Sequence, residues 1–256
     1  MNHPEFKAGF IIQARTGSTR LPGKMTLPFW NEIPIIALLL DRLKVESQGR
    51  YPIILATTEE SSDDILWKIA REKGVKCFRG DEIDVLKRFI NASEQFHLDT
   101  IIRICADNPL LDIGGTLRLG QYWDGQLDYL SYQVAGNKPS ILSHLGLWGE
   151  WVSLKALKRA ANLTKDSFYR EHVTNFIYLN PNQFNVSFVN APESVYSRKD
   201  IRLTIDTLVD FNLVKAMYSD MMDIGLQLNV DSIMSYLKSR PGLIQTMKSQ
   251  IEKNKK

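Results

Sequence analysis

The sequence of 256 residues contains only two cysteines, Cys77 and Cys105, and four histidines. Both cysteines lie in short apolar runs typical of strands, so we expect no disulfide framework and a reducing, cytoplasmic location. The cysteines and histidines also lack the spacing of zinc ligands. No stretch approaches the roughly 18 uncharged apolar residues of a membrane-spanning helix, and no basic-then-apolar leader is present. We therefore expect no contact with a membrane.

The chain also lacks an excess of charge of one sign. Its 32 basic residues face 29 acidic ones, a net charge of +3. The broad positive field of nucleic-acid-binding proteins is therefore missing, and we expect no nucleic-acid partner. Any site for an anion must be local. With 44% apolar residues the chain can bury a substantial core. Because no linker is visible, we expect one domain over 1–256, with an insertion for substrate or dimer contacts around 130–190.

The first half of the chain alternates between strand-length and helix-length segments. Short apolar runs predict strands at 9–14, 52–57, 75–78 and 100–106. Apolar residues at helical spacing predict helices at 35–44, 64–73 and 84–96. This alternation predicts an α/β fold with a mostly parallel sheet covered on both faces. Such sheets bind ligands beyond the carboxyl ends of their strands.

The second half is less regular. We expect strands at 127–131, 184–189 and 201–204, and helices at 154–162, 168–179, 210–223 and 231–239. A polar segment with glycine and proline at 133–143 precedes an aromatic stretch at 145–152. The basic tail at 247–256 is expected to be a frayed, solvated end.

The stretch QARTGSTRLPGKM, Gln13 to Met25, directly follows the first predicted strand. It does not match the P-loop pattern, because five residues separate Gly17 from Gly23 and a methionine follows Lys24. Its glycines nevertheless allow the backbone to approach a ligand, and its three cations suit phosphate oxygens. The residues alone leave two interpretations open, a phosphate site and a solvated turn.

Two aspartates are expected at the same edge of the sheet. Asp107 follows the strand that ends at Ala106, and Pro109 prevents a helix from continuing there. Asp206 precedes a helix. Each also has a plain structural interpretation, a turn for Asp107 and a helix cap for Asp206. Two carboxylates beside a loop that binds a polyphosphate would make a magnesium site.

The string QARTGSTRLPGK resembles the N-terminal signature of the sugar cytidylyltransferases. The resemblance is closest to the spore-coat-polysaccharide type, followed by the 3-deoxy-manno-octulosonate and acylneuraminate cytidylyltransferases. Five further segments follow in the family's order: ILATT (54–58), FRGDEIDVLKRF (78–89), IIRICADNPLLD (101–112), REHVT (170–174) and RLTIDTLVDF (202–211). The resemblance implies a three-layer fold like that of nucleotide-diphospho-sugar transferases, with a mixed, mostly parallel central sheet. It also implies a homodimer.

The resemblance further implies a nucleotide site. Lys24, Arg15 and Asp107 are the expected catalytic residues, and Lys24 would neutralise the departing pyrophosphate. Asp107 and Asp206 are the expected ligands of Mg²⁺, the expected cofactor. The residues expected to surround the nucleotide are Gln13, Ala14, Arg15, Gly17, Ser18, Arg20, Lys24, Ala56, Thr57, Arg79, Gly80 and Asp107. For Ala56 and Thr57 the alternative to nucleotide contact is that they merely form the end of a strand.

The acceptor site is less well defined by sequence. Relatives commonly carry a Gly-Leu-Asp-Val-Glu stretch where this chain has GLWGE (146–150). Trp148 therefore stands where relatives have an aspartate, and the identity of the acceptor sugar stays open. For Arg170 and His172 the alternatives are contact with sugar hydroxyls and a packing or dimer contact. The residues expected at the acceptor are Arg103, Trp148, Glu150, Arg170 and His172.

These features predict transfer of CMP from CTP to a sugar, with an acidic sugar as the expected acceptor and pyrophosphate as the second product. The CMP-sugar would serve surface or coat polysaccharide synthesis. Three alternatives remain. One is a glycosyltransferase that uses a nucleotide-sugar donor, and another is a different nucleotide such as UTP with a sugar 1-phosphate. The third is a non-catalytic nucleotide-binding module.

Overall fold

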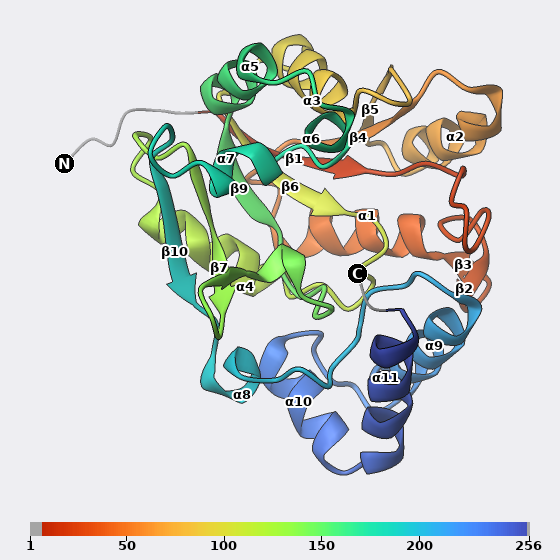
Figure 1. Ribbon diagram of the computed structural model, residues 1–256. Coiled ribbons are helices and arrows are strands. Elements are labelled where there is room, and N and C mark those ends of the chain that lie inside the picture. The colour runs from red at the N-terminus through yellow and green to blue at the C-terminus, as the bar shows by residue number, and fades with distance from the viewer. Residues whose placement is uncertain (1–6, 255–256) are drawn as a thin grey trace.

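The computed structural model describes residues 7–254 and is built around one eight-stranded sheet (Figure 1). Its main path runs β10–β7–β9–β6–β1–β4–β5, and β8 pairs with β7. The strands are β1 (Ala8–Gln13), β4 (Ile53–Thr58), β5 (Lys76–Gly80), β6 (Thr100–Cys105), β7 (Tyr129–Val134), β8 (Lys138–Pro139), β9 (Glu150–Ser153) and β10 (Val186–Asn190). A separate two-stranded sheet joins β2 (Pro28–Trp30) to β3 (Ile33–Pro34). The segment 130–190, predicted as an insertion, supplies strands to the main sheet.

The main sheet is mixed but mostly parallel, as predicted. The pairs β1–β4, β4–β5, β1–β6 and β7–β10 are parallel. On the main path only β9 runs against its neighbours, β6 and β7. The carboxyl ends of β1, β4, β5 and β6 therefore meet at one edge, where α/β folds place ligands.

Helices cover both faces of the sheet (Figure 1). One face carries α3 (Val85–Gln95), α5 (Leu154–Leu163), α6 (Ser167–Glu171) and α7 (Asn175–Leu179). The other carries α1 (Ile35–Glu46) and α4 (Ile113–Arg118), while α2 (Asp64–Glu72) packs beside β5 and α1. The last helices form a further layer beyond α1: α8 (Glu193–Tyr196), α9 (Leu208–Asp223), α10 (Val230–Lys238) and α11 (Pro241–Lys253). Single 3₁₀ turns lie at Ser61–Asp63, Leu119–Tyr122 and Ser140–Leu142. Within residues 7–254, no helix has the length and apolar character needed to cross a membrane.

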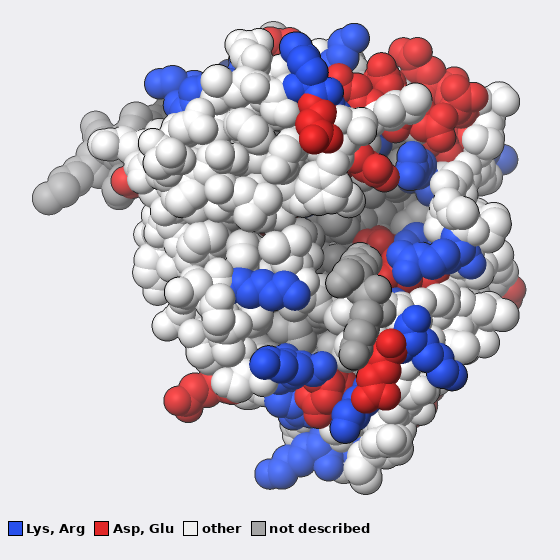
Figure 2. Space-filling model, in the orientation of Figure 1, with Lys and Arg blue, Asp and Glu red and all other residues white. Residues whose placement is uncertain are grey.

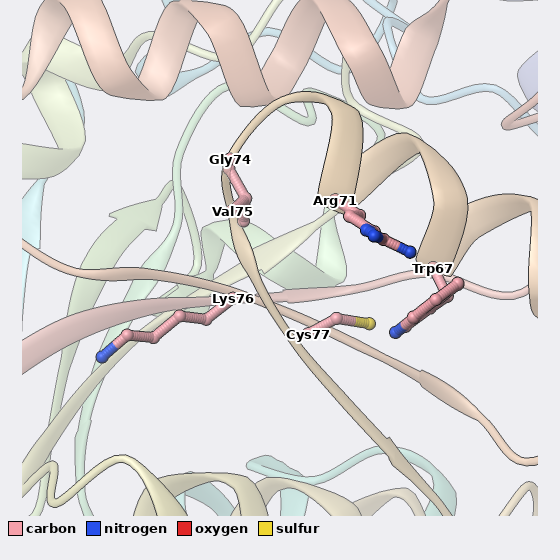
Figure 3. A pocket seen from close by; sticks show the side chains of 6 residues that line it. All are labelled: Trp67, Arg71, Gly74, Val75, Lys76 and Cys77. Carbon is pink, nitrogen blue, oxygen red and sulfur yellow. The ribbon is translucent and has the colours of Figure 1, made fainter.

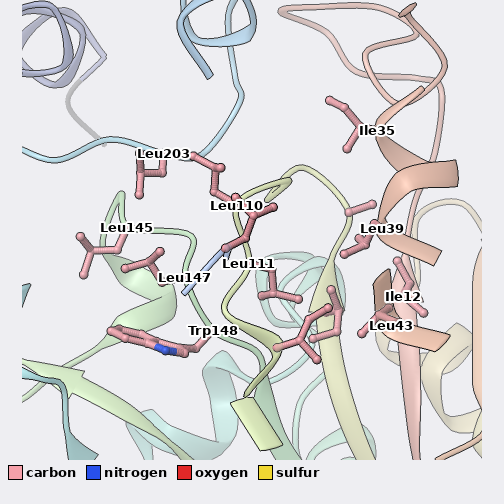
Figure 4. Close-up of a cluster of buried hydrophobic side chains, with 14 of the residues drawn as sticks. Ile12, Ile35, Leu39, Leu43, Leu110, Leu111, Leu145, Leu147, Trp148 and Leu203 are labelled. Carbon is pink, nitrogen blue, oxygen red and sulfur yellow. The ribbon is translucent and has the colours of Figure 1, made fainter. Parts of the chain in front are cut away.

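The sheet separates two apolar cores. Successive side chains of a strand point to opposite faces, so Ile11 packs into the core under α3 and α5 whereas Ile12 packs into the one under α1. Figure 4 shows part of the second core, in which Leu39 of α1 lies near Leu110 and Leu111. Because α1 is apolar on most of its surface, it is buried between the sheet and the C-terminal layer.

Three predicted elements differ in the structure. No strand forms at 201–204, because Leu203 N donates to His144 O (2.9 Å) and Ile205 N to Asp107 O (3.2 Å), which are loop atoms. The helix predicted at 168–179 is broken into α6 and α7 around Val173, whose φ of 46° is incompatible with a right-handed helix. The tail expected to be frayed is helical as far as Lys253, and Met247 is buried. The last two residues of that tail lie outside the described residues.

Candidate functional site

The loop after β1 folds back on itself at the carboxyl edge of the sheet. Gly23 N donates to Thr16 O (3.0 Å), which closes the loop, and Ser18 N donates to the same oxygen (2.8 Å). Gly23 has a φ of 67°, a conformation that favours glycine. Gly17 and Arg20 are exposed, whereas Ala14 is buried at the strand end. The loop therefore presents its polar residues outward from a fixed base.

Asp63 fixes that base, and the sequence did not identify it. Its carboxylate accepts hydrogen bonds from Thr16 N (2.7 Å) and Thr16 Oγ1 (2.6 Å), both in the loop. It also accepts from Thr57 Oγ1 (2.9 Å) and Thr58 Oγ1 (2.6 Å) at the end of β4. Burial raises the pKa of Asp63, but these hydrogen bonds outweigh it, so the pKa lies below its ordinary value of 3.8. One ionised side chain thus joins the loop to the sheet.

We expect Asp63→Ala to lower the free energy of unfolding at pH 7 by about 1–3 kcal/mol, since three hydroxyl groups lose a buried charged acceptor. A carboxyl whose pKa is lowered by folding stabilises above its unfolded pKa and loses this contribution as pH falls through the folded pKa. The difference between wild type and variant should therefore shrink below pH 3.8. Urea denaturation of both proteins at pH 7 and at pH 3 measures this difference in the free energy of unfolding.

The neighbouring Asp64→Ala serves as a control, because this side chain is 62% exposed in its ion pair with Arg79. Exposed pairs of this kind contribute about 0–1 kcal/mol. An equal loss in both variants, or a loss in Asp63→Ala that does not depend on pH, would contradict the anchoring role of Asp63.

Lys24 joins the loop to two other segments. Its Nζ donates to Asp107 Oδ2 (2.9 Å), just beyond β6, and to Ile205 O (2.6 Å). The lysine side chain is 11% exposed and that of Asp107 30%. Because both partners are fixed, the ammonium group is held in place before any ligand arrives.

A second, more buried charge cluster adjoins Lys24. Arg20 Nη2 donates to Asp206 Oδ1 (2.6 Å), and Arg202 Nη2 donates to Asp206 Oδ2 (2.9 Å). Arg202 also donates to both oxygens of Asp210, at 2.8 and 2.9 Å. The helix cap predicted as an alternative for Asp206 is made by Thr207, in a capping box with Asp210. Asp206 is thereby held at the site by Arg202.

Arg15 lies on the opposite side of the loop. It forms long ion pairs with Glu82 (3.9 Å) and with Glu171 of α6 (3.6 Å), and all three side chains are at least one-third exposed. Arg170 instead ties α6 to the body of the protein, through Asp84 (3.2 Å) and Ala161 O (2.7 Å). His172 ends α6, with its ring against Phe168. Of the three, only Arg15 belongs to the loop, while Arg170 and His172 belong to α6 and its end.

The residues predicted near the nucleotide at β4 and β5 lie at the same edge. Thr57 and Ala56 are buried at the end of β4, beside the anchor Asp63. Arg79 holds the segment between β4 and α2 in place, because its guanidinium group donates to Thr58 O and Glu60 O, both at 2.8 Å. Gly80 has no room for a side chain, because an added Cβ would lie 2.7 Å from Phe78.

The predicted acceptor residues Arg103, Trp148 and Glu150 lie inside the protein. Glu150 is 1% exposed, and its carboxylate is paired with Arg103, which also donates to Gln13 Oε1 (3.3 Å). Trp148 is 4% exposed and packs on Tyr132, with ring centroids 4.6 Å apart. Figure 4 shows its indole beside the buried leucines. This burial does not support their predicted contact with a substrate.

Asp107 and Asp206 are the predicted ligands of magnesium, and both oxygens of Asp206 already accept hydrogen bonds, from Arg20 and Arg202. The bond from Ile205 N to Asp107 O keeps their segments adjacent. Their oxygens suit a hard cation, which commonly takes one or two carboxylates together with phosphate oxygens. Among residues 7–254 no group of three His, Cys, Asp or Glu side chains could hold a metal. A magnesium ion here would take its other ligands from water or from oxygens of a bound ligand.

Charged side chains of both signs are also found at the surface. Figure 2 shows side chains of both signs on its right-hand side, where the surface is hollowed. A separate surface hollow of about 360 Å³ lies elsewhere, at the start of β5 between Trp67, Arg71 and Cys77 (Figure 3). Burial raises the pKa of Cys77 to about 11, so its thiol is not a nucleophile at neutral pH. We therefore place the candidate site at the carboxyl edge.

The chain is similar to known proteins along most of its length. The model of the cytidylyltransferase family matches residues 9–236. An uncharacterized protein of Methanocaldococcus jannaschii is 39% identical over 86% of this chain and 88% of its own length. The spore coat polysaccharide biosynthesis protein SpsF of Bacillus subtilis is 35% identical over 82% of this chain and 85% of its own. A solved cytidylyltransferase from Leptospira borgpetersenii is 29% identical, with a TM-score of 0.79 over 94% of this chain and 98% of its own.

Proposed function

The chain belongs to the cytidylyltransferase family, and from this premise we propose that it transfers a cytidylyl group from CTP to a hydroxyl group of a sugar. Pyrophosphate is the second product. The observation that carries the proposal is the fixed ammonium group of Lys24, held by Asp107 and Ile205 O at the carboxyl edge of the sheet. The relative named for spore coat polysaccharide biosynthesis supports a product used in surface or coat polysaccharide synthesis, and we propose an acidic sugar as the acceptor.

The proposed reaction needs positioning and charge neutralisation rather than an enzyme nucleophile. The sugar hydroxyl attacks the α-phosphorus of CTP and loses its proton to water, a new P–O bond forms, and the bond to pyrophosphate breaks. Lys24, Arg20 and Arg15 stand along the loop that would hold the triphosphate, and Lys24 stabilises the negative charge that grows on the leaving group. Asp107 and Asp206 would hold Mg²⁺, which when bound polarises phosphate oxygens.

The direct test is pyrophosphate release from each of the four ribonucleoside triphosphates, with Mg²⁺ and separate pools of acidic and neutral sugars. We expect release from CTP only, and only with the acidic pool. Asp107→Asn should lose most of this activity, because the carboxylate partner of Lys24 is removed. Asp124→Asn, on an exposed loop, should retain it. If the chain released free nucleotide from a nucleotide-sugar and no pyrophosphate, it would act as a glycosyltransferase and the proposal would fail.

The homodimer expected from the resemblance and the cytoplasmic location stay predictions.

A further inference from the structure

Arg42 of α1 reaches the segment that carries Asp107. Its side chain is 13% exposed. Nη1 donates to Pro109 O (2.9 Å), and Nη2 donates to Leu111 O (2.7 Å). These two carbonyl groups lie two and four residues after Asp107. One guanidinium group therefore holds two points of the chain just beyond the candidate site.

A charged side chain stands out on this helix, because the buried residues of α1 are all apolar. A guanidinium group that is largely removed from water is costly unless its hydrogen bonds are made. The third nitrogen of Arg42, Nε, donates to Glu46 Oε1 (3.0 Å). Each nitrogen thus has a partner inside the protein. Arg42 therefore acts through the chain that it holds and not by contact with a ligand.

The stretch held by Arg42 lies between β6 and α4 and belongs to no helix or strand. Leu111 N donates to Asn108 O (3.1 Å), which closes a turn, and Pro109 has no N–H group to donate. Buried carbonyl groups outside regular structure need hydrogen-bond partners. Arg42 supplies these partners for Pro109 and Leu111.

Apolar packing leaves the position of this stretch partly open. Leu110 and Leu111 are 0% exposed and lie near Leu39 of α1 (Figure 4). Burial of apolar side chains is a non-directional force, whereas two hydrogen bonds from one planar guanidinium group fix both distance and orientation. The guanidinium group therefore determines where the stretch lies against α1.

The position of Asp107 depends on this arrangement. Its carboxylate accepts from Lys24 (2.9 Å) and its carbonyl oxygen accepts from Ile205 N (3.2 Å), and both partners lie on loops. β6 fixes Asp107 from one side of the sequence, and Arg42 fixes it from the other. A displacement of about 1 Å at a reacting centre can lower a rate about 100-fold, even when its cause lies far from the chemistry.

We infer that Arg42 is a positioning residue that holds the carboxylate of Asp107 in place for Lys24 and for a bound magnesium ion. It acts through two backbone carbonyl groups. Binding of CTP should depend on it much less, because Asp63 anchors the loop after β1 separately. The inference rests on the proposed function, in which Asp107 would hold the metal ion.

The first test measures kcat, KM for CTP and the Mg²⁺ concentration that gives half-maximal pyrophosphate release. In Arg42→Met, kcat should fall about 10- to 100-fold and the half-activating Mg²⁺ concentration should rise about tenfold, the usual range when an outer partner of a metal ligand is lost. KM for CTP should change by no more than about threefold, since ground-state binding is retained. Arg42→Lys, which can bond one of the two carbonyl groups, should lie between Arg42→Met and wild type.

Arg159→Met is the matched control. Arg159 also bonds a carboxylate, Asp128 (2.6 Å), and a carbonyl group, Gln183 O (2.7 Å), but on α5 and near the start of β7. This variant may lose stability as Arg42→Met does. It should keep the kcat and the Mg²⁺ response of wild type.

Amide hydrogen exchange, followed by NMR, gives a second readout that needs neither catalysis nor a metal ion. Ile205 N reports its bond to Asp107 O, and Phe10 N, which donates to Pro52 O (2.9 Å), reports the central sheet. In Arg42→Met, exchange at Ile205 relative to Phe10 should become about tenfold faster, the effect of losing roughly one hydrogen bond locally. In Arg159→Met this ratio should equal that of wild type.

Three outcomes would overturn the inference. A wild-type kcat and Mg²⁺ response in Arg42→Met, with a lower melting temperature, would make Arg42 a purely structural residue. Equal acceleration of exchange at Ile205 and Phe10 would show a global effect only. If Arg42→Met does not fold, wild-type constants in Arg42→Lys would have the same meaning as the first outcome. A wild type that releases no pyrophosphate from CTP would instead refute the proposed function, and the exchange ratio would then decide on Arg42 alone.

Discussion

Replacing Lys24 with alanine is expected to lower kcat for pyrophosphate release from CTP about 10²–10³-fold, the usual loss when one preorganised contact to a developing charge is removed. The ammonium group is fixed by Asp107 (2.9 Å) and Ile205 O (2.6 Å), so it needs little rearrangement to meet the leaving group. KM for CTP should change much less than kcat, because the contact strengthens as charge develops. Steady-state kinetics of pyrophosphate release separates the two constants.

Lys215→Ala is a matched control. Lys215 Nζ also donates to a backbone carbonyl, Pro28 O (2.9 Å), but on an exposed part of α9. This variant should retain the kcat of wild type. If Lys24→Ala raised KM and left kcat unchanged, Lys24 would bind ground state and transition state equally, and its catalytic role would be refuted.

Replacing Arg202 with methionine is expected to reduce the free energy of unfolding by about 3–5 kcal/mol, because it leaves buried carboxylates without their cation. Arg202 is 1% exposed at its side chain and bonds both Asp206 and Asp210. Burial raises the pKa of Asp210, but the bonds from Arg202 outweigh it and hold that pKa below its ordinary value. In the variant Asp210 should therefore titrate at higher pH, with stability partly restored in mild acid.

Thermal unfolding measures this loss, with an expected decrease in Tm on the order of 10 °C for a chain of this size. The control is Arg198→Met, four residues earlier, whose pair with Asp200 is about one-third exposed on both sides. Its contribution should be about 0–1 kcal/mol. Similar losses in the two variants would show that the buried cluster contributes no more than a surface pair.

The sequence was sufficient for most strands of the main sheet and for the position of the loop after β1, because both depend on local patterns, whereas β8 and β9 were not predicted. Isoleucine-rich runs of six residues have few alternatives to a buried strand. Glycines among three cations indicate a loop suited to anions, and its binding of a phosphate stays a prediction. The anchor Asp63 escaped notice for a physical reason. It stands in the run SSDD, just before a predicted helix, where an aspartate normally signals a helix cap. Its bonds to Thr16 come from a segment 47 residues away.

In the segment Ile201–Ile205 the sequence pattern predicts a strand that does not form in the structure. Its alternation of apolar and polar residues is typical of a half-buried strand, yet its polar member, Arg202, points inward. Pairing with two aspartates outweighs strand formation there, and only the tertiary structure reveals that the partners are present. The family pattern predicts Trp148 at the acceptor, because it replaces a carboxylate there. A large aromatic side chain fits a core as well as a sugar face, and the 4% exposure of Trp148 favours the core.

The distance in sequence between the partners at the site has a consequence for synthesis of the chain on the ribosome. Chains are made from the N-terminus and begin to fold as they emerge. β1 stays an unpaired edge on its β6 side until Thr100–Cys105 has been made. Arg20 cannot pair with Asp206 until the chain has grown by the 186 residues that lead from one to the other. Lys24 can pair with Asp107 and Arg15 with Glu82 and Glu171 before Asp206 has been made. Arg20 is therefore the last cation of the loop to meet its carboxylate, and the candidate site is complete only late in translation.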